Sequence, residues 1–451
     1  MSGTGSLDRV LTFRDLYLLI VGSVIGSGIF LVPATVLQQA GRSIGLALVI
    51  WLAGGILSLL GALTYGELSA RNPAAGGLYI YIRDAFGRLP AFLYGWSLFF
   101  VVGSGAVATL SVAFSAYLSE IVPIDPVARK VISVLMIGVV TIVNIRGTRQ
   151  SADMQNWTTV TKVSAILIMT AVLLIWGRGM SSVGSVLPQK LQGSLWQTFG
   201  IAMIGVLWAY EGWQFVTFNA AEVIEPQRTY PRAFLFGMVT LILLYLLANV
   251  GYLAALGPDR ASGSESIAAA SLSEVAGRWA GKIVACAILI SMFSAANSIV
   301  LSSSRVFYAM AADRLFFARL AEIHPRFHTP AFSILAGSAW AVLMALSGTF
   351  EQLLTYVVFA GWIFYALAAA SLFVYRRKRI GDDAPYRVPG YPLMPLLFIF
   401  SGFALVADTF IARPREAVIG LLILSTGIPA YVLWRRVATR RGLKPANSDA
   451  G

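Results

Sequence analysis

The sequence predicts an all-α membrane protein with twelve transmembrane helices. Of its 451 residues, 57% are hydrophobic and only 12% are charged. A soluble domain carries about 25% charged residues, so this composition excludes an ordinary soluble protein. Apolar runs of about 20 residues, the length that crosses a bilayer, recur along the whole chain. No stretch between them is long enough for a separate soluble core.

Each expected helix is an apolar run, and the connections carry proline, glycine and charged residues. The polar N-terminus leads into the first run through Arg14 and Asp15, and no small-residue cleavage site follows. We therefore expect the first helix to be retained rather than removed as a signal peptide. The twelve helices are expected at 14–38, 43–70, 89–119, 128–147, 156–177, 195–220, 232–256, 280–311, 330–348, 352–375, 392–411 and 415–437.

The first and sixth of these helices contain residues that interrupt a helix. The first carries Gly26-Ser27-Gly28 and the sixth carries Glu211 beside Gly212. Paired broken helices of matching rank are typical of an inverted repeat, so we expect a five-plus-five inverted repeat and two further helices in one integral membrane domain. Its divisions are 1–13 for the cytoplasmic N-terminus, 14–178 and 195–376 for the two five-helix repeats, 392–437 for helices 11 and 12, and 438–451 for the cytoplasmic C-terminus.

The net charge of +13 could indicate a nucleic-acid partner, but the positions of the charges argue against it. With a cytoplasmic N-terminus, most Lys and Arg residues fall on the cytoplasmic side, with the richest runs at 376–379 and 435–441. This is the positive-inside bias of a multi-pass protein in the cytoplasmic membrane. The single cysteine, Cys286, excludes a disulfide framework within the chain and a cysteine-rich metal site.

The segment Gly26-Ser27-Gly28 favours an unwound stretch in mid-membrane, since each glycine lowers helix stability by about 1 kcal/mol relative to alanine. Unwound backbone in a bilayer must be satisfied by protein, water or ligand. The free N–H groups near Gly28 suit a carboxylate, and the carbonyls of the incoming half-helix suit an ammonium. One break thus offers both halves of a zwitterion site. The alternative is a small-residue face that packs against another helix.

Two ionisable side chains, Glu211 and Lys162, lie within expected spans. A carboxylate there costs about 2.5–3.5 kcal/mol on insertion scales and indicates function by default. Glu211 could line a substrate cavity, where it would carry a proton or attract a cationic side chain, or it could be a structural partner. Lys162 could extend to the interface, or could be a fixed positive charge within the membrane.

The eighth helix carries a stripe of hydroxyl side chains at helical period. These hydroxyls could bond to other helices or back to their own helix. The stripe consists of Ser291, Ser294, Ser298 and Ser302.

The sequence lacks the motifs that mark ATP binding and several classes of enzyme. There is no glycine-rich loop for ATP, and no nucleophile elbow or catalytic carboxylate pair. The only histidines, His324 and His328, are separated by prolines from any helix that could make them a metal site. We therefore expect no enzyme activity, no cofactor and no metal, and transport driven by gradients or exchange.

A combination of motifs along residues 12–437 resembles the amino acid–polyamine–organocation superfamily, and within it a bacterial-type member of the L-type amino acid transporter family. The motifs are Gly-Ser-Gly-Ile-Phe at 26–30, Gly-Leu-Tyr-Ile-Tyr at 77–81, Leu-Pro-Ala-Phe-Leu at 89–93, Trp-Ala-Tyr-Glu-Gly-Trp at 208–213, Glu222 with Pro-Gln-Arg at 226–228, Ser-Ser-Arg at 303–305, and Ile-His-Pro at 323–325 with Thr-Pro at 329–330.

The resemblance implies a site for an amino acid substrate between the two broken helices. The carboxylate would bind backbone amides of Ser27, Gly28 and their neighbours Ile25 and Gly26. The ammonium would meet carbonyls near Val24 and at Trp208, Ala209 and Glu211, with Trp208 as an aromatic gate. Lys162 matches a lysine that takes the place of sodium and bridges the first helix near Gly22 to the eighth.

The chain departs from the family pattern in three places. Asn297 is followed by Ser298, so either Ser298 or Ser294 could be the hydroxyl partner of Lys162. Glu211 stands where many members have glycine and others have aspartate, which leaves the side-chain selectivity open. The connection 119–126 has no cysteine, so no disulfide-linked heavy chain is expected.

These observations predict a sodium-independent transporter of L-amino acids in the lipid bilayer, working by exchange or with protons through alternating access. Small or medium neutral substrates are expected. One alternative is an exchanger of cationic amino acids or amines that uses Glu211. Another is a channel or a substrate sensor built on the same scaffold.

Overall fold

The computed structural model describes residues 7–179, 195–264, 266–277, 279–347, 350–412 and 414–440. Those residues are almost entirely helical and form no strand, although one parallel bridge joins Leu11 to Val223. The expectations for 1–6, 180–194 and 441–451 lie outside the described residues.

The α-helices are α1 Phe13–Val24, α2 Gly28–Gln39, α3 Ile44–Arg71, α4 Leu78–Phe86, α5 Arg88–Ser97, α6 Gly103–Ile121, α7 Pro126–Arg146, α8 Thr148–Trp176, α9 Leu195–Ala209, α10 Pro226–Ser262, α11 Ile267–Ala276, α12 Trp279–Ala312, α13 Ala331–Ser347, α14 Phe350–Arg377, α15 Leu393–Ala412, α16 Pro414–Ser425 and α17 Gly427–Arg440.

Three shorter helical turns complete the described elements. A π-helical turn, Leu98–Val102, joins α5 to α6 as one continuous rod. Two 3₁₀ segments follow α9 and α12, at Trp213–Glu222 and Ala318–Ala321.

Local sequence signals explain where several of these helices begin and end. Thr12 and Asp15 form a capping box, in which the Thr12 N–H donates to the Asp15 carboxylate at 2.8 Å. Asp125 caps α7, and its pKa is lowered because its carboxylate accepts N–H groups of Ala128 and Val127. Gly87, with φ of 93°, separates α4 from α5 in a conformation that favours glycine.

Each of the twelve expected helices corresponds to helical structure, with differences at the ends. Helix α8 begins at Thr148 rather than at 156, because its polar first turns are buried against other helices. The short helix α4 was not expected from hydropathy, whereas α11 falls in a connection where a short surface helix had been considered.

In the described residues, eight helices are long and apolar enough to cross a membrane, and a ninth span results if the bent pair α1–α2 crosses as one. The outer helices expose apolar side chains, as lipid-facing helices do, among them Leu135, Ile168 and Phe400. The chain is therefore a multi-pass membrane protein. The count of twelve spans and the five-plus-five repeat stay predictions.

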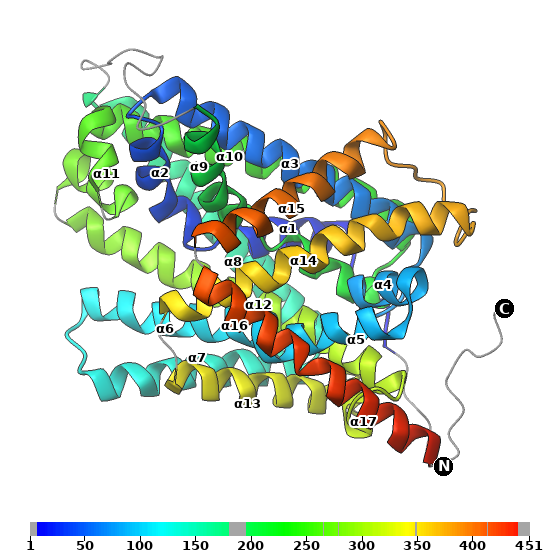
Figure 1. Cartoon of the computed structure of the whole chain (residues 1–451). Helices are drawn as coiled ribbons and strands as arrows, with labels where there is room; N and C mark the ends of the chain where they lie inside the picture. The colour runs from blue at the N-terminus through cyan, green and yellow to red at the C-terminus, as the bar shows by residue number, and fades with distance from the viewer. Residues whose placement is uncertain are drawn as a thin grey trace.

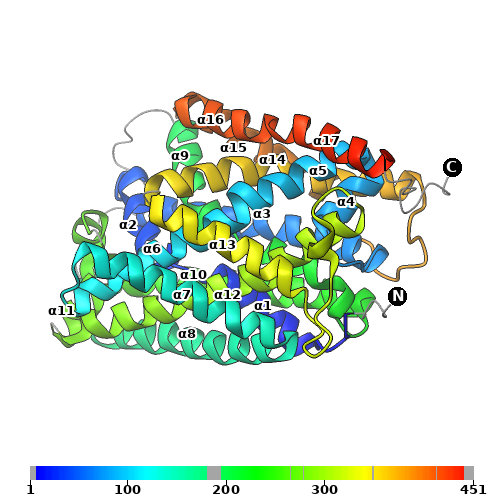
Figure 2. The ribbon, with the colours of Figure 1, turned by 90° about the horizontal axis from the view of Figure 1, so that it is seen from below.

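The long helices run side by side, with α1 and α12 in the interior (Figure 1). Helix α1 packs against α8, α10 and α12, and α2 packs against α9. Figure 2 shows α16 and α17 along one edge of the molecule and α8 along the opposite edge. The interrupted ends of α1 and α9 thus meet in the centre of the bundle, away from lipid.

Candidate functional site

The first break separates α1, which ends at Val24, from α2, which begins at Gly28, and the two axes differ by 47°. No side chain caps the start of α2. The backbone N–H groups of Ser27, Gly28 and Ile29 have no acceptor within the described chain. The start of a helix attracts negative charge because its first N–H groups point outward unpaired. The predicted unwinding between Val24 and Gly28 is confirmed.

The second break lies between the end of α9 at Ala209 and the 3₁₀ segment that starts at Trp213. Gly212 has φ of 127°, a conformation that side chains with a Cβ rarely adopt. A Cβ on Gly212 would lie 2.6 Å from the carbonyl oxygen of Ser23. A Cβ on Gly28 would lie 2.8 Å from the Cβ of Ala209. The two breaks therefore touch each other directly, and glycine is needed on both sides of the contact.

Tyr245, in α10, joins the two breaks from behind. Its hydroxyl oxygen lies 3.2 Å from the carbonyl oxygen of Val24 and 3.1 Å from that of Ala209. The Trp208 carbonyl accepts the Glu211 N–H at 3.1 Å. Three of the four carbonyls expected to meet an ammonium, those of Val24, Trp208 and Ala209, thus already accept a hydrogen bond, but each carbonyl oxygen has a second lone pair. Sequence reasoning missed Tyr245, because a tyrosine in an apolar span is usually a packing residue.

A cavity of about 100 Å³ opens where the two breaks meet. One water needs about 10–15 Å³ of such space, so the cavity has room for a small solute. Residues of α6 and α12, including Thr109 and Ile299, complete its walls. Of the residues predicted for the substrate site, only Ile25 does not line this cavity. The predicted residues that do line it are Val24, Gly26, Ser27, Gly28, Trp208, Ala209 and Glu211.

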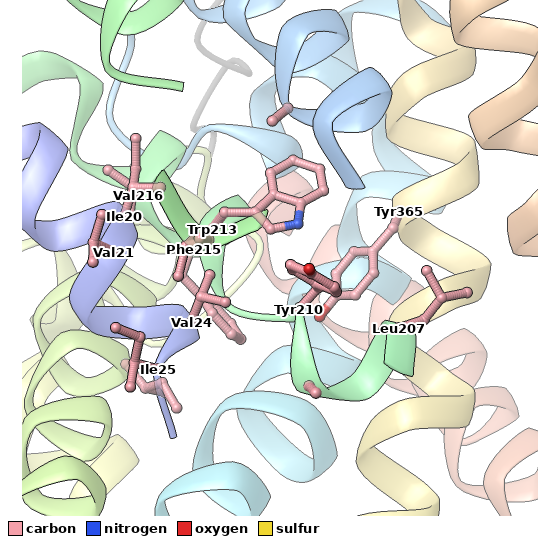
Figure 3. Close-up of a cluster of buried hydrophobic side chains, with 14 of the residues drawn as sticks. Ile20, Val21, Val24, Ile25, Leu207, Tyr210, Trp213, Phe215, Val216 and Tyr365 are labelled. Carbon is pink, nitrogen blue, oxygen red and sulfur yellow. The ribbon is translucent and has the colours of Figure 1, made fainter. Parts of the chain in front are cut away.

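Figure 3 shows the apolar packing around this region, with Val24 and Ile25 on one side and Tyr210 and Tyr365 on the other. Ile25 and Tyr210 are fully buried, and Val24 is 3% exposed. The residues of the first break are therefore packed against the protein interior and have little contact with solvent.

Lys162 lies at the back of the first break, with 1% of its surface exposed. Its ammonium donates to the carbonyl oxygen of Gly22 and, at 2.8 Å, to that of Ile25. The side chain therefore reaches the broken end of α1, and not the membrane interface. The expected contact with Gly22 is present, and Ile25 contributes through its carbonyl instead of lining the cavity.

The link from this carbonyl cluster to α12 is made by Ser291. Its hydroxyl donates to the carbonyl oxygen of Ile25 at 2.7 Å and approaches that of Gly26 at 3.2 Å. Neither of the serines predicted to bind Lys162, Ser294 and Ser298, contacts its ammonium through a hydrogen bond in the described residues. Ser294 accepts a hydrogen bond from Thr158 at 3.0 Å, and the buried Ser298 hydroxyl has no partner among the described residues. The stripe on α12 was found from sequence, but the rotation of α12 decides which of its serines faces the break.

Glu211 reaches from the second break toward α14. Its Oε1 accepts the Tyr365 hydroxyl at 2.9 Å and the Gln214 side-chain amide at 3.3 Å. Its Oε2 is buried and has no partner in the described chain. The carboxylate is thus held by one oxygen while the other stays available.

A buried ion pair between Arg305 and Glu222 lies where Val10 and Leu11, near the N-terminus, contact the bundle. Arg305, in α12, donates to both carboxylate oxygens of Glu222 at 2.7 and 2.8 Å, and the two side chains are 0% and 1% exposed. The Thr148 hydroxyl donates to the same carboxylate at 2.6 Å. The backbone N–H groups of Val10 and Leu11 both donate to the Glu222 carbonyl at 2.9 Å. The sequence analysis contained Glu222 and Arg305 within motifs but did not indicate that the two residues meet.

Comparison with known proteins agrees with this architecture. The family model for amino acid permeases matches residues 11–430. The serine/threonine exchanger SteT of Bacillus subtilis (strain 168) is 30% identical over 418 residues, which are 92% of this chain and 94% of that protein. The human cystine/glutamate transporter is 32% identical over 435 residues, 95% of this chain and 85% of its own length. The mouse large neutral amino acids transporter small subunit 2 is 30% identical over 424 residues, 92% and 79%.

These matches confirm the resemblance seen in the motifs, and they extend over nearly the whole chain. The relatives are named as transporters or exchangers of amino acids, not as enzymes. The protein belongs to the amino acid permease family of the amino acid–polyamine–organocation superfamily, as a relative of SteT and of the L-type transporters.

Proposed function

We propose that this protein is a sodium-independent transporter that exchanges small or medium neutral L-amino acids across the membrane by alternating access. The observation that carries the proposal is the cavity between the two breaks, which is lined by Ser27 and Gly28, whose backbone N–H groups have no acceptor in the described chain. An amino acid presents a carboxylate, which suits the start of a helix. Among the described residues that line the cavity, none has a cationic side chain that could bind the carboxylate instead.

The ammonium of the substrate would bind at the opposite side of the same break. The carbonyls of Val24 and Ala209 lie together, because both are within 3.2 Å of the Tyr245 hydroxyl. Each can accept a second hydrogen bond. Trp208 lines the cavity beside them and would close over the bound substrate.

Independence from sodium is proposed from Lys162. Its ammonium supplies one positive charge and three donors, and two of these already meet the carbonyls of Gly22 and Ile25. A covalently attached cation cannot leave with the substrate, so no ion gradient is consumed there. Exchange is supported by the bacterial relative SteT, which is a serine/threonine exchanger.

The test is counterflow in proteoliposomes of the purified protein. Radiolabelled alanine or serine outside should accumulate only when unlabelled amino acid is inside, with saturation, and equally in sodium and choline media. Methyl esters should compete poorly, because they lack the carboxylate that the N–H groups would bind. Flux without saturation would indicate a channel, binding without flux would indicate a sensor, and an ester that competes as well as its acid would refute the proposed site.

A further inference from the structure

A second cavity, of about 380 Å³, lies where the start of α1 meets the first turns of α8. It shares no lining residue with the cavity between the two breaks. Thr12 and two residues of α1 form one wall, and five residues of α8 form the other. Helix α8 runs along an edge of the molecule (Figure 2). One water needs about 10–15 Å³, so this cavity has room for a far larger group.

The ion pair of Arg149 and Asp15 borders this cavity, and its acceptors are already used. Arg149 donates to both carboxylate oxygens of Asp15 at 2.9 Å. The Thr12 backbone N–H and hydroxyl donate to Oδ2 of the same carboxylate, and the Asn156 side-chain amide donates to Oδ1 at 2.6 Å. Because an ionised carboxylate only accepts hydrogen bonds, this last bond identifies the Asn156 atom that faces Asp15 as the amide nitrogen. The amide oxygen is the atom left over.

Two acceptors and one cation that line the cavity have no partner in the described chain. Asn156 is 8% exposed, and its Oδ1 is a buried acceptor without a donor, which is unfavourable. Asp153 uses only its Oδ1, which accepts from Arg149 at 2.9 Å. The exposed Arg14 guanidinium forms no hydrogen bond or ion pair with a described residue. The cavity therefore suits an occupant that carries both N–H donors and a negative charge.

The same cavity opens onto a surface of α8 that suits lipid chains. Trp157 and Val160, which line it, are 68% and 48% exposed. Tryptophan is enriched where the hydrocarbon of a bilayer meets the headgroups. The polar residues of the cavity precede Trp157 in α8, and an exposed apolar stripe at helical spacing follows it. The stripe consists of Trp157, Val160, Leu167, Ile168, Leu174 and Ile175.

We propose that this cavity binds a phospholipid headgroup with a primary ammonium, of the phosphatidylethanolamine class. The ammonium would donate to Asn156 Oδ1 and to the Asp153 carboxylate, and the phosphate would accept from Arg14. The acyl chains would lie along the apolar stripe of α8. One bound lipid would thus join α1 to α8 beside their ion pair. This lipid site goes beyond the proposed transport function and does not depend on it.

The ammonium is what selects this lipid over others. A primary ammonium has three N–H donors, whereas the quaternary choline group of phosphatidylcholine has none and leaves Asn156 Oδ1 unsatisfied. A bond from an ammonium to the Asp153 carboxylate is charge-assisted and stronger than a neutral one. Phosphatidylethanolamine and phosphatidylcholine with the same acyl chains therefore form a matched pair of probes.

The experiment counts lipids retained by the purified full chain in native mass spectrometry, with equal amounts of dioleoyl phosphatidylethanolamine and dioleoyl phosphatidylcholine. Wild type should retain at least about fivefold more of the ethanolamine lipid. Asp153→Asn should remove most of this preference, because the neutral amide binds an ammonium less strongly. Asp259→Asn is the matched control, since it makes the same chemical change in the exposed pair of Asp259 and Arg42 and should keep the preference.

Two further variants test the other contacts. Arg14→Gln should lower retention of both lipids several-fold and leave their ratio nearly unchanged, because both carry the same phosphate. Asn156→Ala should reduce the preference, because the buried acceptor is gone. That change also removes a donor to Asp15, so thermal unfolding in detergent is measured alongside. If Asn156→Ala does not fold, the exposed positions Arg14 and Asp153 still decide the question.

Equal retention of the two lipids by wild type would refute the ammonium subsite. A preference that survives both Asp153→Asn and Arg14→Gln would place the lipid elsewhere on the protein. Stronger retention of phosphatidylglycerol would show that the arginine alone binds lipid phosphate. Displacement of the bound lipid by equimolar phosphoethanolamine or alanine would show that the cavity holds a free zwitterion instead of a lipid. None of these measurements requires transport, so the lipid site and the proposed function can fail separately.

Discussion

The ammonium of Lys162 lies 2.8 Å from the carbonyl oxygen of Ile25, the residue that directly follows α1. The same oxygen accepts the Ser291 hydroxyl at 2.7 Å. Helices α8 and α12 are thereby joined to the broken end of α1 at one backbone atom. Any motion that tilts α1 against α8 or α12 must break these bonds, so we infer that they hold the first break in its present arrangement.

Replacing Lys162 by alanine should therefore impair transport more than it impairs folding. The change removes a buried cation together with two charge-assisted bonds, each worth about 1.5–3 kcal/mol. We expect the exchange rate to fall at least about tenfold, with substrate still able to protect the protein against thermal unfolding. Lys282→Ala is the control, because Lys282 lies exposed on α12. Full activity of Lys162→Ala, or strict sodium dependence of the wild type, would contradict the role of Lys162.

Ser291 and Ser298 offer a comparison on a single helix. Both are fully buried in α12, but only Ser291 donates to the first break. Ser291→Ala should slow exchange several-fold, since a neutral hydrogen bond contributes about 0.5–1.5 kcal/mol. Ser298→Ala should leave the rate unchanged within about twofold, because its hydroxyl has no partner in the described part of the chain that could be lost. Initial rates of exchange at matched protein levels decide the point, and the reverse order would return Ser298 to the role first expected of it.

Gly28 and Gly26 both line the cavity, but only Gly28 lies in tight contact with another helix. Substituting each of them therefore tests where glycine is required for packing. A Cβ on Gly28 would lie 2.9 Å from the Ala209 Cα, whereas a Cβ on Gly26 would have only the Val24 carbonyl oxygen near it, at 4.0 Å. Gly28→Ala should lower the unfolding temperature in detergent, because overpacking costs about 1–3 kcal/mol. Gly26→Ala should leave the unfolding temperature unchanged. Equal stabilities of the two variants would mean that α9 can move away from α2 freely.

Much of the architecture could be predicted because the bilayer imposes simple rules. Apolar runs of sufficient length located the helices, and residues that are unfavourable in a span located the breaks and Glu211. The span count stays a prediction, since α9 ends at its break and α13 has only 17 residues.

The contacts between helices were beyond such reasoning, because they depend on how each helix is rotated in the bundle. The periodicity of α12 placed Ser291, Ser294 and Ser298 on one face but could not say which one meets the break. Tyr245 was missed for a similar reason, since its hydroxyl has meaning only beside the carbonyls of Val24 and Ala209. The bridge between Leu11 and Val223 joins segments far apart in the chain, and neither segment alone indicates it.

The last prediction concerns the buried pair of Arg305 and Glu222. Removing one partner of such a pair leaves an uncompensated charge and destabilises a protein by about 3–5 kcal/mol. Arg305→Ala should therefore lower the unfolding temperature strongly, because Glu222 would stay buried with only Thr148 as a side-chain donor. The control is Arg260→Ala, whose pair with Glu274 is exposed and should matter little.

A double variant distinguishes a lost charge partner from lost packing. If the damage in Arg305→Ala comes from the unpaired carboxylate, adding Glu222→Gln should restore part of the stability, because the buried negative charge is gone. If the damage comes from lost packing alone, the second change should not help. Thermal unfolding in detergent measures both effects on the same scale. Losses of equal size in Arg305→Ala and Arg260→Ala would show that the pair does not stabilise the end of the bundle where Val10 and Leu11 bind the Glu222 carbonyl.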